Sequence, residues 1–266
     1  MSFRPKRALA VAWKDLVDLR GNRALLASMA VLPVLFALVP AAVVYVYARD
    51  PHDPTLRAMA ELYHPSFPLH ANAAAFLIEK TLTDWFGLFL TLPVFVPILI
   101  SSQSVAGEKE RRTLEPLLAT PVTGAELLAG KSLAALLPAL ALTWLAFFVL
   151  CATVDAVAYT RLGTWPLPNT LWVFGLVVIA PLFAFFGNGI AVLISARVSE
   201  ARLAQQLAGL FVLPMVGLAA GQLGGWLRAG FTYYLVEAAV ILALDAVLIW
   251  AAWHVFDRDR LVSRWR

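Results

Sequence analysis

Apolar residues fall in six blocks of about 20 residues or more, and short charged or proline-containing stretches separate these blocks. An α-helix of this length crosses the hydrocarbon core of a bilayer, which is about 30 Å thick. The core of a water-soluble protein would interleave polar and apolar positions more finely. The predicted transmembrane spans are 24–48, 85–106, 132–154, 171–195, 207–226 and 233–256. The pattern therefore predicts an all-α integral membrane protein with about six transmembrane helices.

Two further elements follow from the same pattern. Residues 1–23 precede the first span and predict an amphipathic interfacial helix, with Leu9, Trp13 and Leu16 on one face. Lys6, Lys14 and Arg20 are placed to meet lipid headgroups or a soluble partner. An amphipathic stretch over 72–84 precedes the second span, and Asn72 is a candidate helix cap there.

Composition agrees with a membrane location. Of the 266 residues 61% are hydrophobic and 14% charged, whereas soluble domains are nearer half apolar and a quarter charged. Almost no residues remain for a separate soluble domain, so we expect a single transmembrane domain over 1–266. Cys151 is the sole cysteine, which excludes an internal disulfide and a metal site built from several cysteines.

The positions of the lysine and arginine residues predict the orientation of the chain in the membrane. The net charge of +4 by itself is compatible with nucleic-acid binding, but most of the 21 Lys and Arg residues stand in short clusters beside apolar blocks. These clusters lie in the amino-terminal segment, in 107–131, in 196–206 and in the tail 257–266. By the positive-inside rule both termini are cytoplasmic, which requires an even number of spans. We expect no nucleic-acid partner.

The segment 107–131 is the most informative loop. It predicts two short helices, and its first part carries both a charged surface and an apolar stripe at positions i, i+3 and i+4. The charged residues are Glu108, Lys109, Glu110, Arg111, Arg112 and Glu115, and the stripe is Leu114, Leu117 and Leu118. Pro121 breaks the chain, and Thr123 with Glu126 predicts a capping box that starts the next helix. A solvated turn whose stripe rests on the membrane surface is the competing interpretation.

This loop carries a family resemblance. Its run Glu-Lys-Glu-Arg-Arg-Thr-Leu-Glu, followed by Leu-Leu-Ala-Thr-Pro-Val and Glu-Leu-Leu-Ala-Gly-Lys, resembles the loop after the second span in permease subunits of the ABC-2 family of ABC transporters. The segment from Trp13 to Arg23 and the six-span layout extend the resemblance to essentially the whole chain.

The resemblance implies an exporter subunit of a bacterial inner membrane that forms a homodimer and binds two copies of a separate ATPase subunit. ATP and Mg would be bound by that partner, and no cofactor by this chain. Residues 108–118 would be the coupling helix between spans 2 and 3. Its charges would set the orientation of the partner, while its leucines would supply the desolvated contact.

The motifs considered for nucleotide binding, metal binding and nucleophilic catalysis do not match this sequence. Gly130-Lys131-Ser132 superficially matches the end of a phosphate-binding P-loop, but Gly124 leaves five residues between the glycines where the motif has four. The segment is also predicted to be helical. The histidines follow no metal-binding spacing, and no nucleophile elbow is present. We therefore expect a transporter subunit without enzymatic activity of its own.

Three polar residues at membrane depth are candidates for the substrate path. Asp245 and Glu237 lie in the sixth span and Asn188 in the fourth, where polar groups are costly. Helix packing, or a neutral carboxyl hydrogen-bonded between helices, is the structural alternative. These carboxylates also open a second hypothesis, a secondary transporter driven by protons. A third is a membrane scaffold whose loop docks a soluble partner.

Overall fold

The computed structural model describes residues 3–110, 122–227 and 230–255. Within these ranges all regular structure is helical, and six helices are long and apolar enough to cross a membrane. They cover Arg23–Arg49, Ala73–Glu110, Gly124–Leu162, Thr170–Arg197, Ala201–Leu223 and Phe231–Ala252. The predicted fold class and the number of spans are confirmed.

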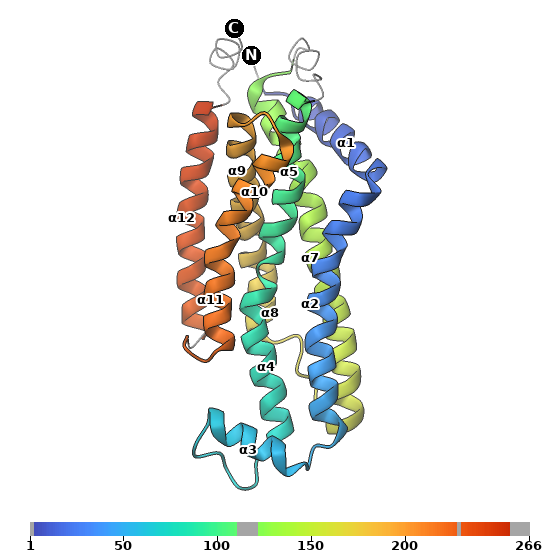
Figure 1. Ribbon diagram of the computed structural model, residues 1–266, viewed down its shortest axis with the longest axis vertical. Helices are drawn as coiled ribbons and strands as arrows, with labels where there is room; N and C mark the ends of the chain where they lie inside the picture. The colour runs from blue at the N-terminus through green and yellow to red at the C-terminus, as the bar shows by residue number, and fades with distance from the viewer. Residues whose placement is uncertain (1–2, 111–121, 228–229, 256–266) are drawn as a thin grey trace.

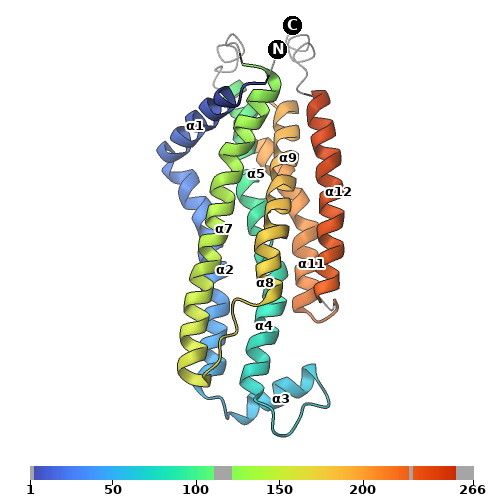
Figure 2. The same ribbon diagram turned by 180° about the vertical axis from the view of Figure 1, so that it is seen from behind.

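The six spans form a long bundle (Figure 1). Helix α2 (Arg23–Arg49) lies beside α7 (Gly124–Leu162) on one side, and α12 (Phe231–Val255) lies on the other. Between them run α5 (Leu92–Glu110) and α9 (Ala180–Arg197), which are packed together. The view from behind shows α7 and α12 on either side of α9 (Figure 2). Helix α1 (Pro5–Gly21) lies at the end of the bundle at which α12 ends, and we call this the α1 end.

The second span differs most from its prediction. It consists of α4 (Ala73–Phe89) and α5, so the helical segment begins before the predicted span start at residue 85. The Asn72 side chain caps α4 by accepting a hydrogen bond from the Ala75 N–H, and Leu77 and Ile78 are buried. Lys80 and Asp84 form an i,i+4 ion pair within α4. The stretch 72–84 is therefore the first part of the spanning helix.

The other spans agree with the prediction to within several residues. The fourth contains α8 (Thr170–Phe174), a π-helical turn (Gly175–Ile179) and α9. The fifth contains α10 (Ala201–Gly209), a 3-10 turn (Leu210–Val212) and α11 (Leu213–Leu223). The predicted capping box of Thr123 and Glu126 is present and starts α7. Helix α3 (Pro54–Tyr63) lies at the end of the bundle opposite α1.

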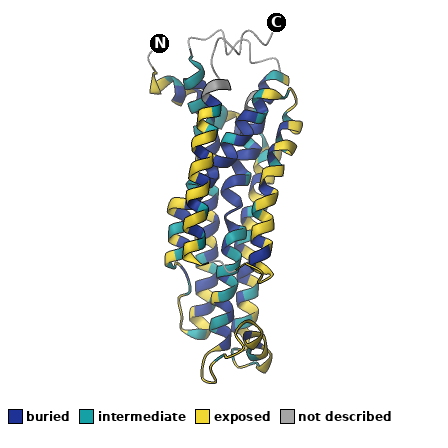
Figure 3. Ribbon diagram, turned by 90° about the vertical axis from the view of Figure 1, so that its left-hand side faces the viewer, coloured by how far each residue is buried: buried dark blue, intermediate teal, exposed yellow. Residues whose placement is uncertain are grey.

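The buried residues lie along the axis of the bundle, and the exposed residues lie on its flanks (Figure 3). Trp172 is completely buried and makes ring contacts with Phe86, Phe89 and Phe147. Many large apolar side chains remain exposed on the flanks, among them Leu35, Phe148 and Val240. Large exposed apolar surfaces mark contact with a membrane or with another protein, and the composition predicted a membrane.

Helix α1 crosses the bundle obliquely (Figure 1). Its small side chains, including Ala8 and Val11, are buried and face α7 at Gly130. A Cβ atom at Gly130 would lie 2.5 Å from the Ala8 carbonyl oxygen, so the glycine permits this close approach. Leu9 and Trp13 remain 59% and 64% exposed. The predicted apolar face thus points away from the bundle.

Candidate functional site

The predicted coupling loop connects the end of α5 to the start of α7 in the sequence. Glu108, Lys109 and Glu110 belong to the end of α5. The other predicted coupling residues, Arg111, Arg112, Leu114, Glu115, Leu117 and Leu118, lie outside the described residues. We call the end of α5 and the start of α7 the two roots of the loop. The structure shows how both roots are held at the α1 end of the bundle.

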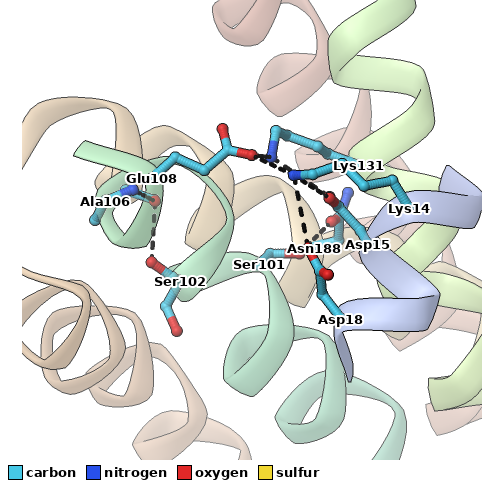
Figure 4. A network of polar contacts seen from close by, with 10 residues as sticks. Lys14, Asp15, Asp18, Ser101, Ser102, Ala106, Glu108, Lys131 and Asn188 are labelled. Atoms are coloured by element: carbon cyan, nitrogen blue, oxygen red, sulfur yellow. Dashed lines mark hydrogen bonds and ion pairs between the residues drawn. The ribbon is translucent and has the colours of Figure 1, made fainter. Parts of the chain in front are cut away.

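Four charged residues from three helices form an ion-pair cluster at these roots: Lys14, Asp15, Glu108 and Lys131 (Figure 4). Nζ of Lys131 lies 2.9 Å from Oε1 of Glu108 and 3.4 Å from Oδ2 of Asp15. Nζ of Lys14 lies 3.2 Å from the same Glu108 oxygen. The cluster thus joins α1, α5 and α7, which are separate in the sequence.

Burial makes this cluster energetically important. The side chain of Lys131 is 3% exposed and that of Glu108 is 11% exposed. Ions removed from water are stable only when paired, because the desolvation penalty is several kcal/mol per ion. Burial lowers the pKa of the Lys14 amino group, but the carboxylates of Asp15 and Glu108 outweigh this effect and raise it above its ordinary value. Lys14 therefore stays charged at neutral pH.

Lys109 and Glu110 tie the end of α5 to the α9–α10 connection. Nζ of Lys109 donates hydrogen bonds of 2.7 Å and 3.2 Å to the carbonyl oxygens of Ala196 and Val198. The last carbonyls of a helix lack intrahelical partners, so a lysine there satisfies them. The Ala201 N–H donates to Oε2 of Glu110 at 3.4 Å.

Glu126 holds the second root of the loop. Its Oε2 accepts a hydrogen bond of 2.8 Å from the Thr123 N–H and completes the capping box. Its Oε1 accepts one of 2.7 Å from the Arg4 N–H just before α1, and Arg7 lies 3.8 Å from Oε2. Both roots of the loop are therefore bound to α1.

Deeper in the bundle, two hydrogen-bonded contacts join α5 to α9. The Ser195 hydroxyl accepts from the Ala106 N–H at 2.8 Å and donates to the Ser102 carbonyl at 3.0 Å. These are the two groups that an uninterrupted α-helix pairs with each other. In the second contact, Ser101 Oγ donates to Asn188 Oδ1 at 2.7 Å.

The predicted substrate-path residues separate into two places. Asn188 Nδ2 donates to Ser132 Oγ at 2.9 Å, and both residues line a cavity of about 100 Å³ together with Asp245. Glu237 does not line this cavity. The structure therefore brings Asp245 and Asn188 together and leaves Glu237 apart.

A larger cavity of about 1450 Å³ opens beside the ion-pair cluster. Its walls come from α1, the start of α2, α5, α7 and α10, and they carry charges of both signs, including Asp18, Glu200 and Arg202. Among the described residues no group of three or more His, Cys, Asp or Glu side chains is arranged to hold a metal ion.

The sequence placed Lys131 in a cation cluster, in the run that carries the family resemblance and in a failed P-loop match, but it did not predict the pairing of Lys131. Gly130-Lys131-Ser132 lies inside helix α7, as predicted. A lysine at the start of an apolar block needs a buried anion, and that requirement was the available signal. The anions come from Asp15 and Glu108, whose positions only the folded chain reveals.

Comparison with known proteins agrees with this architecture. A family model described as ABC-2 family transporter protein matches residues 9–249, which include α7, α9 and most of α12. No curated protein matches the chain. Because the family model covers most of the sequence and the six membrane-spanning helices fit a permease, the chain belongs to the ABC-2 family and is a multi-pass membrane permease of an ABC transporter.

Proposed function

We propose that this permease is the membrane subunit of an ATP-driven exporter in a bacterial inner membrane. Two copies form a homodimer and bind two copies of a separate ATPase subunit, which holds ATP and Mg. Substrate moves outward along a path between the protomers. The family membership supports this assignment.

The observation that carries the proposal is the ion pair between Glu108 and Lys131. It closes the base of the loop that the ATPase would contact, and Asp15 extends it to α1. A displacement of the loop is therefore passed to α5 and α7 at once, because both ends of the loop move with them. Lys109 carries the same displacement to the end of α9.

The outer part of the loop would form the contact with the ATPase. In this proposal Arg111, Arg112 and Glu115 orient the partner, and a desolvated stripe of Leu114, Leu117 and Leu118 fills its groove. Charged residues at an interface act mainly on specificity and association rate, whereas buried apolar anchors supply affinity. Substitution of the leucines should therefore weaken binding of the ATPase more than substitution of the charged residues.

The proposed orientation places the α1 end in the cytoplasm. Lys6, Arg7, Arg20, Arg197 and Arg202 all lie in the elements at that end, and the positive-inside rule favours their retention there. Both termini are then cytoplasmic, and α3 faces the outside.

Co-purification with the ATPase tests the proposal. The tagged permease is coexpressed with a candidate ABC ATPase subunit from the same genome and purified in detergent, and ATP hydrolysis of the eluate is measured. Leu114→Glu/Leu117→Glu should lose the ATPase. Leu62→Glu is the matched control, because Leu62 is 83% exposed on α3 at the opposite end. Absence of any ATPase with the wild type contradicts the proposal.

A second candidate is a proton-driven transporter that uses Asp245 and Glu237. Both Asp245 carboxylate oxygens and one Glu237 oxygen are buried without a hydrogen-bond partner among the described residues, which favours a proton-binding role. This mechanism predicts transport that an uncoupler abolishes and ATP depletion spares. The ATP-driven exporter shows the opposite response in inverted membrane vesicles.

A further inference from the structure

The cavity of about 100 Å³ lies between α7, α9 and α12 and contains an incompletely satisfied carboxylate. Asp245 is 5% exposed, and neither of its carboxylate oxygens has a hydrogen-bond partner among the described residues. A buried carboxylate without a partner is costly, and more so at membrane depth. The position therefore favours a ligand that brings positive charge and hydrogen-bond donors.

The other polar groups of the cavity suit the same ligand. Ser132 Oγ accepts a hydrogen bond from Asn188 Nδ2, and Asn188 is itself fixed by Ser101. A hydroxyl oxygen has two lone pairs, so Ser132 retains accepting capacity beside Asp245. Lys131, the next residue along α7, is engaged with Glu108 and does not line the cavity. The cavity thus offers several acceptors, and no lysine or arginine lines it in the described part of the chain.

Size and position restrict the ligand further. Pockets for whole drug-sized molecules occupy roughly 300–1,000 Å³, so this cavity holds only a small head group. Phe185 and Ile249 line it and are 47% and 54% exposed on the flank of the bundle. Exposed apolar side chains at such a flank suit contact with lipid. A ligand whose head group enters the cavity can therefore leave an apolar tail among the lipids.

We propose that the Asp245 cavity binds the primary ammonium head group of a membrane amphiphile, which enters sideways from the lipid. The three N–H donors of the ammonium group match the two Asp245 oxygens and Ser132 Oγ. Asn188 is a positioning residue, because it holds Ser132. Only the statement that such amphiphiles are a class of cargo rests on the proposed exporter function.

Binding is tested with the purified chain, without any ATPase, in nanodiscs of phosphatidylcholine. The probe is dodecylammonium at pH 7.5, and the measurement is the rise of Tm with probe concentration. Saturable stabilisation is expected for the wild type. Asp245→Asn should weaken binding by about tenfold or more, because it removes the charge that hydrogen-bonds the ligand. Glu237→Gln is the matched control on the same helix and should bind like the wild type.

Two further variants keep the proposal falsifiable if Asp245→Asn does not fold. Ile249→Trp places a larger side chain at an exposed position of the cavity mouth, and Ser132→Ala removes one acceptor. Both should weaken binding. Wild-type affinity in both of them, or in a folded Asp245→Asn, overturns the proposal.

Probes with the same dodecyl chain and different head groups test whether the charge and the N–H donors are needed for binding. Dodecanol lacks the charge and dodecyltrimethylammonium lacks the N–H donors, so neither should match dodecylammonium. Equal binding of dodecanol overturns the proposal, and so does Asp245-dependent stabilisation of the same size by NaCl or KCl alone. Equal binding of the trimethylammonium probe overturns the role of the three donors.

Two experiments distinguish a resident lipid from transported cargo as the molecule that carries the ammonium group. If phosphatidylethanolamine in the nanodisc competes with the probe, the site holds a resident lipid. If dodecylammonium stimulates ATP hydrolysis by the complete complex, and Asp245→Asn abolishes that stimulation, the site takes cargo. Binding is measured without the ATPase, so failure of the proposed exporter leaves this result intact.

Discussion

Oε1 of Glu108 lies 2.9 Å from Nζ of Lys131, so the last turn of α5 and the first part of α7 are joined by a nearly buried ion pair. The two residues flank the loop that we propose as the coupling element. Asp15 adds α1 to the same contact. The relationship makes the base of the loop a rigid junction of three helices.

The first prediction concerns Lys131. Lys131→Met leaves the carboxylates of Glu108 and Asp15 without their buried partner, and this should lower the free energy of unfolding by about 3–5 kcal/mol. The double variant Lys131→Met/Glu108→Gln should be destabilised by less than the sum of the two single changes. Unfolding of the purified protein in detergent measures both effects.

Lys14→Met is the control for this prediction. The Lys14 side chain is 49% exposed, and pairs of that kind contribute about 1 kcal/mol or less. If Lys131→Met and Lys14→Met are equally destabilising, the ion-pair cluster does not hold the loop in the way described.

The second prediction concerns the packing of α1 against α7 at Gly130. A Cβ at Gly130 would lie 2.7 Å from Val11 Cβ and still closer to the Ala8 carbonyl, so Gly130→Ala should push α1 away from α7. We expect a loss of about 1–3 kcal/mol, as for other overpacked sites, and faster proteolysis near α1. Gly217→Ala is the control, because no atom lies within 4 Å of its added Cβ. Equal stability of the two variants would disprove the close approach.

The third prediction concerns the Ser195 bridge between α9 and α5. Ser195→Ala removes a hydroxyl that binds both the Ala106 N–H and the Ser102 carbonyl, and it should cost about 1–3 kcal/mol. Thermal unfolding measures the loss. Thr160→Ala removes an exposed hydroxyl that contacts a carbonyl of its own helix, and it should change stability far less. A comparable loss in both variants would mean that the bridge adds nothing beyond a local contact.

The fourth prediction concerns Glu126, whose two oxygens accept from two different backbone N–H groups. A glutamine has one acceptor oxygen, so Glu126→Gln can satisfy only the Arg4 or the Thr123 N–H. Glu126→Ala satisfies neither and should cost about 1–2 kcal/mol, with Glu126→Gln in between. Hydrogen exchange at Arg4 and Thr123 should accelerate in the same order.

Glu61→Gln serves as the control for Glu126, since the Glu61 side chain is 48% exposed and pairs with Arg57 of its own helix. Unchanged exchange at both amides in Glu126→Ala would show that the carboxylate does not link the loop to α1.

The six spans, the capping box of Thr123 and Glu126 and the cap at Asn72 could all be predicted, because each depends on neighbours within one or two helical turns or on the thickness of a bilayer. The sequence did not show that the stretch 72–84 continues into the helix of the second span, since the burial of Leu77 and Ile78 depends on packing against other elements.

By itself the sequence determined that the chain is a helical membrane protein, which helices cross the bilayer, and to which family it is similar. The tertiary structure decided which polar groups meet: Lys131 with Glu108 and Asp15, Ser195 with the backbone of α5, and Asp245 with Asn188 around one small cavity. The physical reason is that hydrophobic length and capping are local properties of the chain. A buried charge or hydroxyl finds its partner only when helices distant in sequence pack side by side.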